Sequence, residues 1–149
     1  MRVTGYAIVD FTGTGSEPAI IEGGAIRTDP HADIARRIEQ IHADLAVLLA
    51  EFRPNLVAIE NLYAHYAHPR TSILMAHARG VVLLAAQQAQ VAVRGLSATK
   101  VKKNLTGNGH ASKRQVQRAI QAVCRLDTLP EPPDLADALA IALCAGRQR

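Results

Sequence analysis

Three acidic residues lie at the edges of strongly apolar stretches. Glu60 ends the apolar run at 56–59, and open α/β sheets carry their sites at the carboxyl ends of strands. Asp134 and Asp137 open the apolar C-terminal stretch, and a spacing of three places them on one helical face. An acid in so apolar a helix needs a partner. Because hard oxygen ligands select Mg²⁺ or Mn²⁺ over zinc, the pattern predicts a divalent-metal site.

Plain structural roles are the alternative for these acids. Glu60 could simply reach solvent from the end of its strand. Asp134 could cap the C-terminal helix and Asp137 could be a first-turn acid, since the helix dipole favours both. Carboxylates on two elements could instead hold paired ions roughly 4 Å apart for phosphodiester hydrolysis, one activating water and the other stabilising the leaving oxygen.

Basic residues gather in one stretch that contains no Asp or Glu from position 100 to position 125. The chain as a whole carries a formal net charge of +4. A stretch whose charged residues are all positive is typical of a surface that binds a polyanion. A helix face that is simply exposed to solvent is the alternative. The residues concerned are Lys100, Lys102, Lys103, Lys113, Arg114 and Arg118.

Composition narrows the class of protein. The chain has 149 residues, of which 48% are hydrophobic and 20% charged, which indicates one globular domain over 1–149. No apolar run is long enough for a membrane helix, and the N-terminus lacks a secretory apolar region, so we expect a cytoplasmic protein. Cys124 and Cys144 form no disulfide framework or CxxC pair. P-loop, nucleophile-elbow and HExxH patterns are absent.

The elements that must position these residues follow from hydrophobic periodicity. Strands are expected at 3–11, 19–27, 56–60 and 91–93, the first two as a hairpin. A helix should open at Asp29 as its cap, another should span 70–90, and Ser97 and Ser112 should cap two more. The last helix should run from about Asp134 to Gly146. The order predicts an α/β domain with a mixed sheet.

Six short segments stand out along the chain: RVTGY at 2–6, AIE at 58–60, ARG at 78–80, GNG at 107–109, SKRQVQ at 112–117 and DLADALAIA at 134–142. In this order they resemble the RuvC family of Holliday junction resolvases, and the resemblance covers essentially the whole chain.

The resemblance implies a ribonuclease H-like three-layer fold with a mixed central sheet, working as a homodimer. Each subunit would nick one of two opposed strands of four-way junction DNA, using water and Mg²⁺, with Mn²⁺ as a substitute. Branch-migration proteins of the Ruv system are further partners that it suggests.

The resemblance also suggests roles for single residues. Glu60 is similar to the family's second metal-binding carboxylate, and Asp134 and Asp137 to its C-terminal pair. Lys113 and Lys102 match basic residues near the scissile phosphate. Apart from the resemblance, the wholly positive charge of the stretch favours DNA contact by Lys100, Lys103 and Arg114 as well. Tyr63 matches an aromatic that stacks on junction bases, worth roughly 1–3 kcal/mol per base. An ordinary loop tyrosine is the alternative there.

One departure concerns the start of the chain. The family carries a strand of the type ILGIDPGS, with the first metal-binding Asp, just before RVTGY, whereas here Met1 precedes Arg2. We therefore expect the first strand to be missing, leaving unpaired edges and a three-carboxylate site. A start codon assigned too late is the preferred explanation, and a short, catalytically impaired chain is the other.

The sequence also permits other functions. The missing Asp would allow a protein that binds junction DNA without cutting it. A sugar-kinase-like ATPase half-domain would share the general fold, but no glycine-rich phosphate loop is present. The expected homodimer would use the small residues of the helix at 76–90, which permit close helix approach, although packing against the sheet would need them too. They are Ala76, Ala78, Gly80, Ala85 and Ala86.

Overall fold

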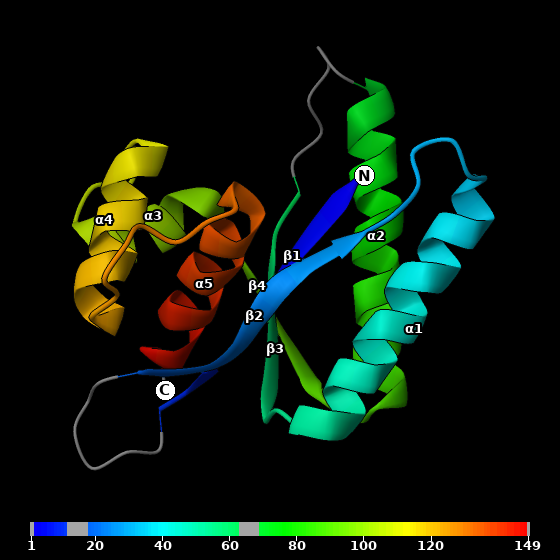
Figure 1. The fold of residues 1–149 in the computed structure, drawn as a ribbon, viewed down its shortest axis with the longest axis horizontal. Coiled ribbons are helices and arrows are strands. Elements are labelled where there is room, and N and C mark those ends of the chain that lie inside the picture. The colour runs from blue at the N-terminus through cyan, green and yellow to red at the C-terminus, as the bar shows by residue number, and fades with distance from the viewer. Residues whose placement is uncertain (1, 12–17, 63–68, 149) are drawn as a thin grey trace. The chain divides into compact units, whose positions relative to one another are not determined.

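The chain begins with two strands, alternates between helices and strands in its middle part and ends with three helices (Figure 1). The structure, a computed structural model, describes residues 2–11, 18–62 and 69–148. Its elements in order are β1 (Val3–Asp10), β2 (Ala19–Arg27), α1 (Ile34–Phe52), β3 (Leu56–Glu60), α2 (Pro69–Gln88), β4 (Ala92–Leu96), α3 (Ala98–Thr106), α4 (Lys113–Cys124) and α5 (Pro133–Gly146). The expected α/β order is confirmed, with most boundaries within a few residues.

The strands pair as two ladders, β1 with β2 and β3 with β4. The β1–β2 ladder is antiparallel, because Thr28 donates to the carbonyl of Arg2 (3.0 Å) while Gly24 lies against Tyr6. β3 and β4 flank the helix α2, the arrangement of a parallel crossover unit. In the described residues the strands form these two separate ladders rather than one sheet.

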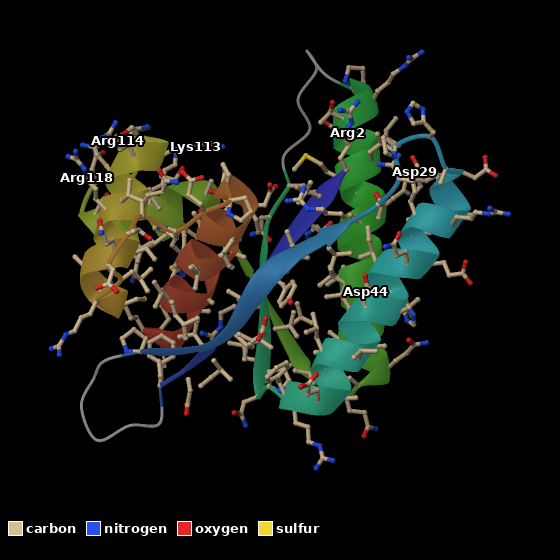
Figure 2. The ribbon with its side chains drawn as sticks, viewed as in Figure 1. Arg2, Asp29, Asp44, Lys113, Arg114 and Arg118 are labelled. Atoms are coloured by element: carbon tan, nitrogen blue, oxygen red, sulfur yellow. The ribbon has the colours of Figure 1, made fainter. Side chains whose placement is uncertain are left out.

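The start of α1 differs from expectation. The helix begins at Ile34, and Asp33 flanks it without a side-chain cap. Asp29, labelled in Figure 2, instead accepts a hydrogen bond from the backbone N–H of His31 (2.8 Å). An aspartate that bonds the backbone two residues on forms a local turn. The prediction that Asp29 caps this helix was therefore wrong.

The caps of α3 and α4 are confirmed. Ser97 accepts from the backbone of Lys100 (3.2 Å). Ser112 forms a reciprocal capping box with Gln115, whose side chain accepts from the Ser112 N–H (2.8 Å). Between the two helices Gly107 ends α3 with φ +77°, a conformation that favours glycine. These helices therefore begin where the sequence alone places them.

The contacts divide the chain into two compact units, each with its own core. Unit 1 comprises 1–4 and 26–95, with α1 packed against α2 over a core of Ile26, Ile41, Val81, Ala85 and Ala86. Unit 2 comprises 5–25 and 96–149, and its helices α3, α4 and α5 pack on one another. Its buried residues include Leu96, Val101, Val116, Ile120, Leu139, Leu143 and Cys144.

No described helix combines the length and the apolar character that a membrane crossing requires.

Candidate active site

The two C-terminal aspartates lie in the first and second turns of α5. Pro132 flanks the helix, Pro133 is its first residue, and no side chain caps it. Proline suits this position because its missing N–H would have no helical partner. Asp134 therefore lies inside the first turn, and the alternative that it caps the helix is wrong. Its carboxylate remains at the positive end of the helix dipole.

Two glycines bring the start of α5 against the β1–β2 ladder. A methyl group on Gly5 would collide with the backbone carbonyl of Asp134, and one on Gly23 would come within 2.7 Å of the Leu135 side chain. Close approach of another backbone is a common reason for glycine inside a strand. Sequence reasoning assigned these glycines no role in the site, although a glycine inside each predicted strand was a signal for one.

Lysines from two other helices act on the charge of Asp137. Its side chain as a whole is exposed, yet desolvation of the carboxyl raises the pKa of Asp137 above its ordinary value. Among the charges, Lys113 of α4 lowers that pKa, Asp134 raises it, and Lys102 of α3 lowers it. Two acids on one helix, with two lysines near enough to act on the charge of Asp137, are suited to bind a cation and a phosphate together.

The basic stretch separates into different surfaces. Lys102 and Lys113 act on Asp137. Lys100 and Lys103 instead line a shallow hollow with Asn104 and Gln148, where Arg147 donates to the Asn104 carbonyl (3.5 Å). Figure 2 shows Lys113, Arg114 and Arg118 projecting from α4. Of the predicted DNA-binding lysines, Lys102 and Lys113 act on the charge of Asp137, and Lys100 and Lys103 line the hollow.

Glu60 is the last residue of β3 and is half-buried in unit 1. Arg79 of α2 donates from Nε to the Glu60 carbonyl (3.3 Å) and from Nη2 to Oδ1 of Asn61 (3.3 Å). Arg79 was assigned no role from the sequence. The signal for one was an arginine between two small residues, Ala78 and Gly80, inside one of the family-like segments.

The structure thus brings Asp134, Asp137, Lys102 and Lys113 together in unit 2, and it places Glu60 at a strand end in unit 1. Within the described ranges, no three His, Cys, Asp or Glu side chains form a group that could hold a metal ion. Tyr63 lies outside the described residues.

Known proteins similar to this chain share one description. A family model described as crossover junction endodeoxyribonuclease RuvC matches residues 1–145. The RuvC protein of Rhodopirellula baltica is 42% identical over 144 residues, which are 97% of this chain and 80% of that protein. The RuvC protein of Heliobacterium modesticaldum is 36% identical over 142 residues, covering 95% of this chain and 86% of the relative.

Two solved structures are also similar. One of Thermus thermophilus RuvC has a TM-score of 0.89 at 34% identity and covers 97% of this chain and 87% of its own. The other is described as T. thermophilus RuvC in complex with Holliday junction substrate. It has a TM-score of 0.84 at 30% identity and covers 98% of this chain and 93% of its own.

These comparisons correct one expectation and confirm another. The family model matches from residue 1, and β1 at Val3–Asp10 is the strand expected at 3–11. The expectation that the chain lacks the first strand of the fold is therefore not supported. The expected ribonuclease H-like α/β fold is confirmed by the similarity to the two solved structures.

Proposed function

The chain belongs to the RuvC family of crossover junction endodeoxyribonucleases, and on this premise we propose that it resolves four-way DNA junctions by Mg²⁺-dependent phosphodiester hydrolysis. The observation that carries the proposal is the pairing of Asp134 and Asp137 with Lys102 and Lys113 in unit 2. DNA is a polyanion that carries cations with it. The lysines are suited to bind its phosphates, and the aspartates are suited to bind a cation.

The carboxylates fit a magnesium ion. Asp137 has a partly desolvated carboxyl whose pKa is raised with Asp134 nearby, so a divalent cation would offset both the desolvation and the repulsion. Glu60, Asp134 and Asp137 would hold the metal, with Mn²⁺ as a substitute. When bound, Mg²⁺ supplies an activated water and stabilises the leaving oxygen.

The basic residues of the chain bind and orient the DNA. Lys113 and Lys102 hold the scissile phosphate next to the aspartates and offset its charge as hydrolysis proceeds. Lys100, Lys103 and Arg114 contact phosphates farther along the backbone, where they add affinity without sequence preference. Tyr63 stacks on a junction base.

The chain acts as a single nuclease domain over 1–149 and as a homodimer. Some small residues of α2 pack inside the subunit and others are exposed, and the exposed ones support the dimer. Ala85 and Ala86 are buried in unit 1, whereas Ala76 and Gly80 are exposed, and nothing lies within 4 Å of a methyl group built on Gly80. The helix therefore has an open face for a second subunit.

Proteins of the Ruv branch-migration system are proposed as further partners, and the cytoplasm as the compartment. Both cysteines are free thiols, Cys144 buried and Cys124 half-buried, as is usual in a reducing compartment.

Substitution of the acids tests the proposed function. We expect Asp134→Asn, Asp137→Asn and Glu60→Gln each to reduce cleavage by at least about 100-fold, because each removes a charge that acts on the transition state. Binding of the junction in EDTA should stay within about twofold of the parent protein, since the phosphate contacts come from lysines. Cleavage of a labelled four-way junction in Mg²⁺ and its retention in a gel measure the two effects.

Asp127→Asn, at an exposed acid between α4 and α5, is the matched control and should cleave normally. If Asp134→Asn cleaves at the parental rate, the proposed catalytic role of these acids is wrong. Junction binding by the parent protein without any cleavage would instead identify a binding module.

A further inference from the structure

Arg79 joins α2 to the end of β3 by two hydrogen bonds. Its Nε donates to the main-chain carbonyl of Glu60 and its Nη2 to the side-chain oxygen of Asn61, both at 3.3 Å. One planar guanidinium thus holds two consecutive residues at the point where the strand ends. Such a pair of bonds restricts both the backbone of Glu60 and the direction in which the chain leaves it.

The amide of Asn61 is enclosed from a second side by β4. A methyl group on Gly95 would collide with Oδ1 of Asn61, the atom that accepts from Arg79. The absence of a side chain at Gly95 therefore creates the space that Asn61 occupies. Three elements meet at this amide: the end of β3, the middle of α2 and the end of β4.

One side of the strand end faces an open hollow. Asn61 and Leu62 line this hollow of about 470 Å³ together with Ala76, Arg79, Gly80 and Leu83. Fewer atoms pack against the strand end from that side. The two hydrogen bonds of Arg79 reach the strand end from α2.

Arginine is suited to this task in a way that lysine is not. Its N–H groups lie in one rigid plane and reach two acceptors at once, whereas lysine is a flexible point charge. Groups that hold a metal or a substrate need placement within about 0.5 Å. A residue that holds the backbone of Glu60 contributes to that placement without touching the reacting atoms.

We propose that Arg79 is a positioning residue for the nuclease site, which fixes Glu60 at the end of β3 through the Glu60 carbonyl and the Asn61 amide. The proposal rests on the proposed function for the role of the Glu60 carboxylate. It predicts that loss of Arg79 loosens residues 60–62, raises the Mg²⁺ concentration needed for cleavage and leaves junction binding unchanged.

The experiment compares Arg79→Met and Arg79→Lys with the parent protein. Arg70→Met is the matched control, since Arg70 is an exposed arginine of the same helix. Amide hydrogen exchange at 60–62 is followed in metal-free protein, together with junction binding in EDTA and a Mg²⁺ titration of cleavage. For Arg79→Met we expect faster exchange and a rise of about tenfold or more in the half-saturating Mg²⁺ concentration.

Arg79→Lys should fall between Arg79→Met and the parent, and Arg70→Met should match the parent in every measurement. If Arg79→Met does not fold, Asn61→Ala removes only the second bond and should speed exchange at 60–62 with a smaller shift in the Mg²⁺ titration. Unchanged exchange in the folded variant, or a loss of cleavage explained by lost DNA binding, would overturn the proposal.

The variants of Glu60 and Arg79 test the roles of these two residues separately. If Glu60→Gln cleaves like the parent, the proposed role of Glu60 is wrong, while the exchange at 60–62 still reports on Arg79. If Glu60→Gln is inactive and Arg79→Met matches the parent in exchange and Mg²⁺ dependence, only the inference about Arg79 is wrong.

Discussion

Asp134 and Asp137 share a helix face but differ in their surroundings. Asp134 lies in the first turn of α5, next to the backbone of Gly5. Asp137 is one turn farther on, where Lys113 and Lys102 approach its partly desolvated carboxyl. Spacing along the sequence predicted that the two acids are neighbours. The lysines beside Asp137 come from α3 and α4, so tertiary packing alone selects them from the basic stretch.

Asp137→Asn is expected to change the pH dependence of stability in metal-free protein. The folded-state pKa of Asp137 is raised above 3.8, so folding favours the protonated carboxyl. Its stabilising contribution is complete below the unfolded-state pKa and is lost as pH rises through the folded-state pKa. Above that pH the variant should be more stable than the parent, because asparagine cannot ionise.

Urea unfolding in EDTA, from strongly acidic to neutral pH, measures this difference. The gain in unfolding free energy should shrink to nothing at the acidic end. If the unfolding free energies of the two proteins differ by the same amount at every pH, desolvation of the Asp137 carboxyl does not affect stability and the prediction is wrong.

At the scale of elements, local signals predicted some boundaries and missed others. Ser97 and Ser112 cap α3 and α4 as expected, because capping involves residues within one turn. Asp29 carries the same kind of signal but forms a local turn with His31. The contact of α5 with the β1–β2 ladder through Gly5 and Gly23 joins distant parts of the chain, so no local pattern could specify it.

Gly5→Ala tests this contact. The new methyl group would collide with the Asp134 carbonyl and must displace the start of α5, so we expect a loss of about 1–3 kcal/mol in unfolding free energy. Cleavage should fall as well, because Asp134 moves with the helix. Denaturant unfolding and the junction cleavage assay measure the two effects.

Gly80→Ala is the control, since a methyl group there meets no atom within 4 Å. At a protein concentration that keeps subunits apart, it should gain up to about 1 kcal/mol from helix propensity. Equal effects of the two substitutions would mean that the close approach at Gly5 is unimportant.

At the scale of the whole molecule, α2 presents an apolar face that no described residue covers. Its outer stripe consists of Ile73, Ala76, Gly80 and Leu84, which recur at helical spacing and are all exposed. Ile73 and Leu84 expose 58% and 52% of their surface. Large apolar side chains around small ones are suited to a close helix–helix contact between subunits.

Leu84→Glu and Ile73→Glu are each expected to weaken the proposed homodimer by at least about tenfold, the effect of 1.4 kcal/mol. A buried, unpaired carboxylate at the interface is the physical reason. Sedimentation equilibrium over a range of concentrations measures the dissociation constant. Val47→Glu, at an equally exposed apolar residue of α1 (63%), should leave it unchanged, and a monomeric parent protein would contradict the dimer.

The sequence by itself determined the α/β order, the caps of α3 and α4, the acids and the basic stretch, because these depend on periodicity and on residues within a turn or two. It also carried the family resemblance that the comparisons confirm. Only the tertiary structure decided that Lys102 of α3 and Lys113 of α4 act on the charge of Asp137. It likewise decided that Arg79 holds the end of β3. Contacts between elements distant in sequence depend on how those elements pack, and no local pattern encodes that packing.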